Sequence, residues 1–183
     1  MKKIFLLIIL FFFFTKLQGQ KILFVGNSLT YTNNMPSILK EIGKSFDKKI
    51  ITKMICKPNY AIIDHLNEGI IQQEIASKEY DLVIIEQGPS SQKQGREMLI
   101  NDGRKIAKVC SKNNTMLGYF MVWPSKQYYF TFNKVIKNHT EAAKKTMHYF
   151  FLLESIGSNM KNLKTKLLFI IKIYFIHQKL VVY

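Results

Sequence analysis

The sequence predicts an α/β domain in which helices cover both faces of a parallel sheet. Two observations lead to this prediction. Short apolar runs of strand length alternate with longer stretches of helical periodicity, which is the pattern of βαβ units. The chain has 183 residues, of which 48% are hydrophobic and 21% are charged, and these values are typical of one globular domain.

The N-terminal segment has the layout of a secretory signal peptide. Two lysines precede an unbroken apolar run from Ile4 to Phe14, which is too short to span ~30 Å of hydrocarbon comfortably as a helix. Polar and small residues follow, up to Gly19. We therefore expect a signal peptide over residues 1–19 and an exported mature chain, periplasmic or secreted, that starts near Gln20. An uncleaved N-terminal anchor is the alternative.

Strands are expected where short apolar runs end in glycine or polar residues, namely Lys21–Val25, Ile50–Ile55, Asp81–Glu86 and Met116–Trp123. Helices are expected between them, where apolar residues recur at helical spacing: from Pro36 through Phe46, from an Asp64 cap through Ile70 to Ile75, and over Arg96–Lys112 and Asn133–Thr146. Ligands of such sheets bind at the carboxyl ends of the strands. A functional site is therefore expected at that edge.

Polar loops follow three of the predicted strands, at positions 26–30, 86–92 and 123–127. The first contains Gly-Asn-Ser-Leu-Thr and presents Ser28 at the edge of the sheet. A serine in this place can act as a nucleophile if a base reaches it. Taken alone, Gly-Asn-Ser after a strand is more often a simple turn.

The stretch FVGNSLTYTNNMP resembles the first sequence block of the SGNH (GDSL-like) hydrolases, in particular exported bacterial members with GNSLT, a glutamine loop and a Trp-Pro loop. The resemblance covers Lys21 to Thr146. It implies a three-layer α/β/α, flavodoxin-like fold for a domain over residues 20–146. It also implies that Ser28 is the nucleophile and that the Ser28 backbone N–H contributes to the oxyanion hole, whose donors stabilise the tetrahedral intermediate.

The resemblance also suggests the other site residues, at positions that depart from the family pattern. Asn59 stands where the family has a glycine, and asparagine tolerates a left-handed backbone better than most residues. Gln87 stands where the family has an asparagine amide and is one methylene longer. Both are expected in the oxyanion hole, and Trp123 is expected in the substrate loop. The alternatives are a turn role for Asn59 and loop hydrogen bonds for Gln87.

The family's Asp-x-x-His block, which supplies the catalytic base, does not occur in this chain. No aspartate follows Asp102, so the later histidines stand without one. Codons permitted for Lys172–Lys179 encode Asp-Leu-Phe-His-Pro-Ser-Lys in another reading frame. We therefore hypothesise a frameshift near Thr146. Residues 147–183 would then be an aberrant tail, and the C-terminal part of the fold would be incomplete.

The expected function is that of an exported serine hydrolase that acts on acyl or acetyl esters of small molecules or carbohydrates. Its activity is expected to be impaired because the base is missing. A non-catalytic ligand-binding remnant and a membrane-associated protein anchored by its tail are the alternatives. Membrane contact is expected only if the signal segment or the tail is retained as an anchor.

Composition argues against several other classes of protein. The net charge is +15, but only Arg96 and Arg104 among the 27 basic residues are arginines, so nucleic-acid binding is not expected. Two cysteines are too few for a closed zinc site, and no Gly-Lys follows Gly-Asn-Ser-Leu, so no metal and no cofactor are expected. Export would permit a disulfide between Cys56 and Cys110, and two separate thiols are an equal alternative.

Overall fold

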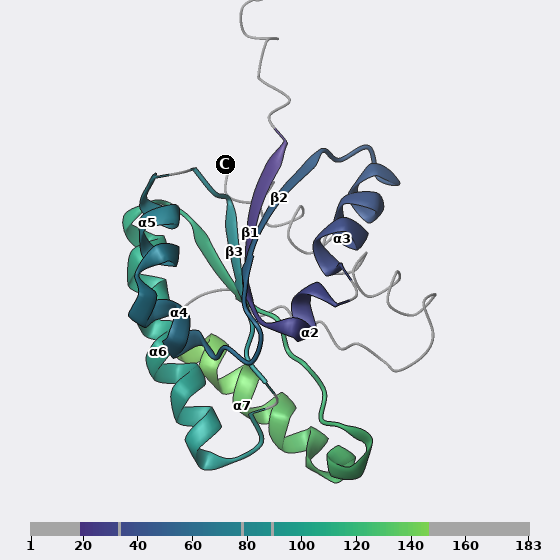
Figure 1. The fold of residues 1–183 in the computed structure, drawn as a ribbon, viewed down its shortest axis with the longest axis vertical. Coiled ribbons are helices and arrows are strands. Elements are labelled where there is room, and N and C mark those ends of the chain that lie inside the picture. The colour runs from purple at the N-terminus through teal and green to yellow at the C-terminus, as the bar shows by residue number, and fades with distance from the viewer. Residues whose placement is uncertain (1–18, 33, 78, 89, 147–183) are drawn as a thin grey trace, which may run out of the picture.

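A parallel four-stranded sheet forms the centre of the molecule (Figure 1). The computed structural model describes residues 19–32, 34–77, 79–88 and 90–146. The strands are β1 (Gln20–Gly26), β2 (Ile50–Cys56), β3 (Leu82–Ile85) and β4 (Met116–Tyr119), in the spatial order β2-β1-β3-β4. This order reproduces the first four strands of the flavodoxin-like sheet. The predicted α/β class and parallel sheet are confirmed.

Helices lie on both sides of this sheet. They are α2 (Ser28–Tyr31), α3 (Met35–Lys44), α4 (Ile62–Glu68), α5 (Ile70–Ser77), α6 (Lys93–Lys112) and α7 (Phe132–Lys145), with a 3₁₀ helix, η1 (Lys126–Thr131), before α7. Figure 1 shows α3 on one side of the sheet and α4, α5 and α6 on the other. The short α2 follows the carboxyl end of β1.

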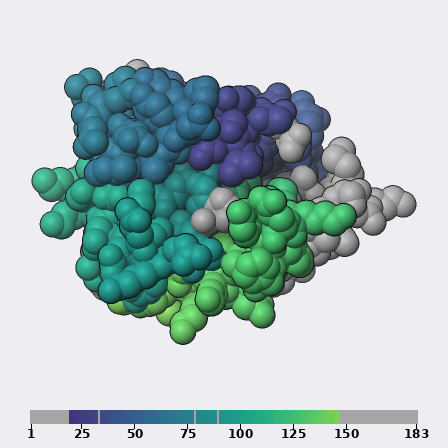
Figure 2. All heavy atoms as spheres, turned by 60° about the horizontal axis from the view of Figure 1, so that its bottom comes forward, coloured from purple at the N-terminus to yellow at the C-terminus, as the bar shows by residue number. Residues whose placement is uncertain are grey.

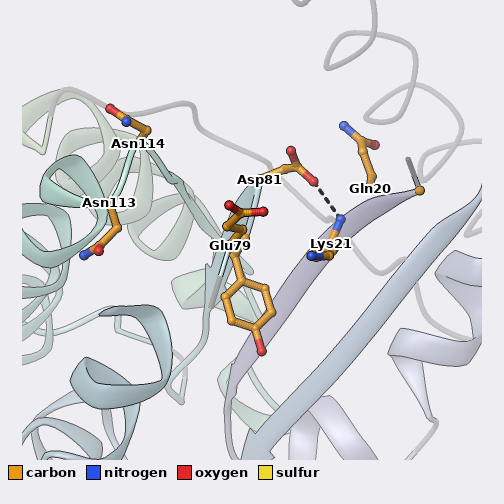
Figure 3. A pocket seen from close by; sticks show the side chains of 8 residues that line it. Gln20, Lys21, Glu79, Asp81, Asn113 and Asn114 are labelled. Atoms are coloured by element: carbon orange, nitrogen blue, oxygen red, sulfur yellow. Dashed lines mark hydrogen bonds between the residues drawn. The ribbon is translucent and has the colours of Figure 1, made fainter. Parts of the chain in front are cut away.

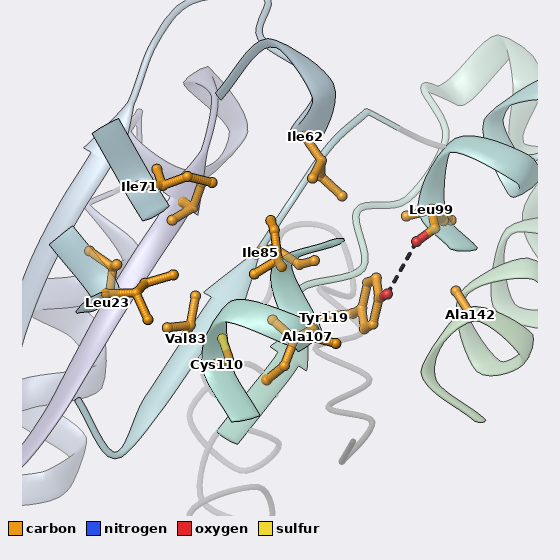
Figure 4. Packing of buried hydrophobic residues seen from close by; sticks show 14 of the residues in the cluster. Leu23, Ile62, Ile71, Val83, Ile85, Leu99, Ala107, Cys110, Tyr119 and Ala142 are labelled. Atoms are coloured by element: carbon orange, nitrogen blue, oxygen red, sulfur yellow. Dashed lines mark hydrogen bonds between the residues drawn. The ribbon is translucent and has the colours of Figure 1, made fainter. Parts of the chain in front are cut away.

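Alternating side chains of the strands build one core on each face of the sheet. On β1, Ile22 and Phe24 belong to the cluster that contains Leu39 of α3. Leu23 and Val25 point the other way and pack among residues of α4, α5, α6 and α7 (Figure 4). Because residues 22–25 of β1 and all of β3 are buried on both faces, these stretches are continuously apolar, as expected for central parallel strands.

The packing of α6 against β4 depends on a glycine. The Tyr119 hydroxyl donates a hydrogen bond to the Leu99 carbonyl at 3.1 Å (Figure 4). A Cβ atom at Gly103 would lie far inside the contact distance of this hydroxyl oxygen and 2.9 Å from Cζ of the same ring. Gly103 therefore makes room for Tyr119 to reach α6.

The helix predicted from Asp64 to Ile75 is in fact two helices. Gly69 ends α4 in a left-handed conformation with φ 75°, as is common at helix C-termini, and α5 begins at the next residue. The predicted Asp64 cap is wrong: Ala61 is the N-cap, and Asp64 lies within the first turn, where its carboxylate accepts the Ala61 N–H at 2.8 Å. Ile70, expected on the apolar face, is 47% exposed because of this break.

Other boundaries differ from the predictions at the ends of elements. Helix α3 ends at Lys44, which leaves Phe46 beyond it and largely exposed. Strand β4 ends at Tyr119, so Trp123 lies in a loop and not in the predicted strand. Helix α6 begins at Lys93, three residues earlier than predicted. The short elements α2 and η1 were not predicted.

The two cysteines do not pair in the structure. Cys110 lies on the buried face of α6 in the core, and Cys56 ends β2 and is half-buried. Burial raises the pKa of both thiols to about 12, so both stay protonated at neutral pH. In this conformation they are two separate thiols, which was one of the two expected alternatives.

An ion pair between Arg96 of α6 and Glu141 of α7 joins these two helices, and Lys145 binds the same carboxylate. The Arg96 guanidinium donates through Nε and Nη2 to the two carboxylate oxygens of Glu141, and Lys145 lies 2.9 Å from the same carboxylate. The hydrogen bonds from Arg96 and then Lys145 lower the pKa of Glu141 to about 2. This bidentate pairing is the geometry that arginine provides and lysine does not.

The predicted signal peptide and the tail lie outside the described residues, apart from Gly19. Within residues 19–146, as far as the structure describes them, no helix is both long enough and apolar enough to cross a bilayer.

We predict that Gly103→Ala destabilises the domain by ~1–3 kcal/mol, because the new methyl group must displace Tyr119 from its site. Urea denaturation monitored by circular dichroism measures this. The matched background is Tyr119→Phe, which lacks the hydroxyl and keeps the ring contact at Cζ, so the alanine should cost less there. Equal costs in the two backgrounds would show that the Tyr119 hydroxyl is not the obstacle.

A second prediction concerns His139, which is fully buried on α7 and whose Nδ1–H donates to the Val135 carbonyl at 2.9 Å. Burial lowers its pKa from 6.5 to about 4. The unfolded chain therefore takes up a proton first as pH falls, and up to ~3 kcal/mol of stability should be lost between pH 6.5 and 4. His139→Asn, which keeps an N–H donor, should flatten this dependence in urea titrations. If both proteins lose stability in parallel, the titration of His139 is not the cause.

Candidate functional site

The predicted nucleophile lies on a tight turn at the carboxyl end of β1. Asn27 has an extended backbone and caps α2 by accepting the Leu29 N–H through Oδ1 at 2.9 Å. Ser28 is the first residue of α2 and is half-buried. The cap fixes the backbone on both sides of Ser28, so the serine has a defined place at the edge of the sheet.

A buried carboxylate lies beneath this turn. Glu86 follows β3 directly and is 2% exposed. Its Oε2 accepts the Asn27 N–H and the Thr30 hydroxyl, each at 3.0 Å. Burial raises the pKa of Glu86, and the hydrogen bonds from Asn27 and Thr30 oppose that rise.

The loop after β2 lies beside the nucleophile turn. The Lys57 N–H donates to the Gly26 carbonyl at 3.2 Å, and Asn27 Nδ2 donates to the Tyr60 carbonyl at 3.0 Å. Asn59 lies between these two contacts, exposed and in a left-handed conformation with φ 60°. A glycine adopts this backbone conformation without strain, as expected for a residue that stands where the family has a glycine.

Side chains on α4 hold the same loop. The Glu68 carboxylate accepts the Tyr60 hydroxyl at 2.7 Å and the Lys57 ammonium at 2.5 Å through the same oxygen. The Tyr60 ring also packs against His65, with ring centroids 5.0 Å apart. The residues on both sides of Asn59 are thus tied to one helix.

Gln87 lies at the edge but directs its amide into its own loop. Nε2 donates to the Ser90 hydroxyl at 2.9 Å and to the Gly95 carbonyl at 3.4 Å. Since both amide hydrogens are engaged there, Gln87 supplies an oxyanion donor only after one of these bonds is exchanged. The alternative role, as a loop hydrogen bonder, describes the conformation observed.

Trp123 lies in the loop after β4 and is half-buried. The following residues, Ser125, Lys126 and Gln127, line an open hollow of about 470 Å³ at the start of η1. Figure 2 shows the end of the molecule toward which β1 runs, with the purple N-terminal segment, the blue segment after β2 and the green segment of η1 on one face. The topology thus brings the predicted site segments to one end of the sheet.

Neither histidine of the described residues is placed as a general base. His65 is fully buried and its Nε2–H donates to the Gly26 carbonyl at 2.8 Å, on the inner side of the turn. Burial lowers the pKa of His65, so the ring is neutral above that pKa. His139 is buried on α7, bonded to its own helix. His148 and His177 lie outside the described residues.

A second hollow, of about 450 Å³, lies at the opposite end of the sheet (Figure 3). Its lining includes Lys21, Asp81 and Asn114, and the Lys21 N–H donates to Asp81 at 2.7 Å. This hollow is separated from Ser28 by the length of β1. Among the described residues, no group of three His, Cys, Asp or Glu side chains is arranged to hold a metal.

Sequence reasoning missed the two carboxylates that organise the site. Glu86 directly follows the apolar strand β3, and a charge directly after a fully buried run is a signal that could have identified it. Glu68 carries no such signal, because its partners, Lys57 and Tyr60, are brought to it only by the turn between β2 and α4.

Comparison with known proteins supports the fold. No protein-family model and no curated protein matches the chain. Several solved structures do. A Slackia heliotrinireducens protein described as an SGNH hydrolase has a TM-score of 0.63 at 16% identity, over 74% of this chain and 80% of its own. The psychrotrophic esterase EstA from Pseudoalteromonas sp. has a TM-score of 0.62 at 14% identity, over 85% and 98%.

A variant of Axe2, an acetyl xylan esterase from Geobacillus stearothermophilus, is similar with a TM-score of 0.57 at 12% identity, over 76% of this chain and 80% of its own. Identities this low establish similarity of fold and not of activity. The order of the strands, the position of Ser28 after β1 and these superpositions agree with one another. The described part of the chain therefore has the fold of the SGNH hydrolases, as the Gly-Asn-Ser-Leu-Thr motif predicted.

Proposed function

We propose that this protein is a serine hydrolase of ester bonds, with Ser28 as its nucleophile. The observation that carries the proposal is the position of Ser28: on a capped turn at the carboxyl end of β1, next to the left-handed Asn59 loop, in an SGNH hydrolase fold. Among α/β sheets this is where ligands bind, because the crossovers on the two sides of β1 diverge there.

In this mechanism the Ser28 hydroxyl oxygen attacks the ester carbonyl carbon, and the proton of the hydroxyl must pass to a base. The backbone N–H groups of Ser28 and Asn59 are the proposed donors to the resulting oxyanion. Gln87 joins them when its amide leaves Ser90 or Gly95. Loss of a triad member leaves only the ~10³–10⁴-fold rate enhancement over water that oxyanion binding provides, so a chain without Asp-x-x-His is impaired.

The proposed substrates are acyl or acetyl esters, including those on carbohydrates. One structural neighbour is named as an acetyl xylan esterase. In this chain, Tyr128, Tyr129 and Phe130 of η1 are 55%, 57% and 83% exposed beyond the Trp123 loop. Exposed tyrosine and phenylalanine rings offer rigid contact area for a substrate larger than the acyl group. We also propose that residues 1–19 direct export of the protein to the periplasm or beyond.

The first test of this function is Ser28→Ala in the full chain, with Ser111→Ala on the exposed surface of α6 as the control. Hydrolysis of p-nitrophenyl acetate and labelling by a fluorophosphonate are measured. Both should depend on Ser28, and in a chain with a restored base kcat should fall at least ~10³-fold. Ligand binding with no labelling and no change in turnover would favour the non-catalytic alternative instead.

The second test is the nucleotide sequence across Lys144–Met147. We propose that a frameshift near Thr146 separates Ser28 from its base, so the DNA should contain an A-rich homopolymer there. The other frame should stay open through an Asp-x-x-His block, and the corrected protein should be soluble and hydrolyse esters. Stop codons in that frame before the block would refute the frameshift, and a membrane role for residues 147–183 would then become the leading alternative.

A further inference from the structure

One carboxylate oxygen joins two points of the nucleophile turn. Oε2 of Glu86 accepts the backbone N–H of Asn27 and the side-chain hydroxyl of Thr30. These residues lie directly before and two positions after Ser28. Both are almost fully buried, so water does not readily replace the carboxylate as their acceptor.

The end of β1 is shaped to let this carboxylate approach. A Cβ atom at Gly26 would lie 2.7 Å from Glu86 Oε2 and 2.7 Å from Thr30 Oγ1. Any side chain at position 26 would therefore push the carboxylate and the turn apart. The Gly26 φ is not in the left-handed region, so space and not backbone freedom is what the glycine provides here.

The same contacts reach the rest of the proposed oxyanion hole. Asn27, held by Glu86, donates through Nδ2 to the Tyr60 carbonyl, next to Asn59. Gln87 is the residue after Glu86, on the same segment leaving β3. The side chains of Glu86 and Asn27 together thus connect the three segments that carry Ser28, Asn59 and Gln87.

We propose that Glu86 is the positioning residue of the active site: by binding Asn27 and Thr30 it sets the orientation of Ser28 and its spacing from the Asn59 loop. This inference rests on the proposed function, since it concerns how an esterase nucleophile is held. Glu86 does not touch the substrate and is not a catalytic residue.

The energetics of Glu86 favour this role over simple packing. Burial of a carboxylate costs free energy that a leucine or methionine of similar volume would not. Its other oxygen, Oε1, has no hydrogen-bond partner among the described residues, so that cost is only partly offset. What the carboxylate adds in return is an acceptor aimed at the nucleophile turn, at a place where an apolar side chain would leave the Asn27 N–H unpaired.

The test compares Glu86→Leu with Glu86→Gln in the full chain, with Glu41→Gln on the exposed surface of α3 as a control. Leucine removes the acceptor, whereas glutamine keeps one oxygen that can accept both bonds. Amide hydrogen exchange by NMR reads the turn directly. Exchange at Asn27 should accelerate about 10- to 100-fold in Glu86→Leu, the factor expected for a lost hydrogen bond to a charged group. It should stay near the wild-type rate in the other two variants.

Reactivity supplies the second readout. Glu86→Leu should lower kcat for p-nitrophenyl acetate, or the rate of fluorophosphonate labelling, with KM little changed, and Glu86→Gln should recover most of the loss. A loss of stability alone would reduce both kcat and the folded fraction, which circular dichroism would detect. Unchanged Asn27 exchange and unchanged reactivity in a folded Glu86→Leu protein would overturn the proposal.

A titration of the wild-type protein covers the case in which Glu86→Leu does not fold. The Asn27 amide proton shift should change as Glu86 ionises, above the usual pH range of a carboxyl group, and Glu86→Gln should abolish that change. The other titratable groups near this carboxylate are the Cys56 thiol and the His65 ring behind Gly26, and both remain in Glu86→Gln. An identical titration in both proteins would refute the contact.

If Ser28→Ala leaves turnover unchanged, the esterase function fails, while these NMR results still decide whether Glu86 holds the turn.

Discussion

The pairing of β1 with a parallel strand on each side is the constraint on which the rest of this structure depends. β2 pairs along the whole of β1, from Gln20 to Gly26, and β3 pairs with its middle, from Ile22 to Val25. The connection from β1 to β2 therefore runs through α3 on one face of the sheet, and the connection from β2 to β3 runs through α4 and α5 on the other face. The loops that follow these strands lie at the carboxyl end of the sheet, and Ser28 begins the first helix there. The hydrogen bonds of Asn27, Lys57 and Glu86 link these loops to one another.

The sequence predicted the parts of this structure that depend on local pattern. The strand at Asp81–Glu86 and the helix at Arg96–Lys112 were found because their apolar spacing is uninterrupted. The alternation of strands and helices predicted a parallel sheet, and therefore predicted that Ser28 lies at the carboxyl ends of its strands. Asparagine tolerates a left-handed backbone, and Asn59 adopts that conformation in the structure.

The parts that could not be predicted depend on contacts between distant residues. Gly69 lies within a continuous helical pattern, and only its backbone conformation reveals that two helices meet there. The direction of the Gln87 amide depends on Ser90 and Gly95, two small groups that no periodicity marks. Glu86 is visible in the sequence as a charge after a buried strand, but its partners lie 56 and 59 residues away.

The position of β2 at an edge of the four-stranded sheet has a consequence for association between copies of the chain. Within the described residues no strand pairs with the outer side of β2, and Ile51 and Met54 of this strand expose apolar surface. A strand of this kind is a template for pairing with another molecule. Lys53 in the middle of β2 pairs with Glu74 at 2.7 Å, and Lys57 after its end pairs with Glu68 at 2.5 Å. If two such edges came together, these charged groups would lose water, and the cost of that desolvation acts against self-assembly.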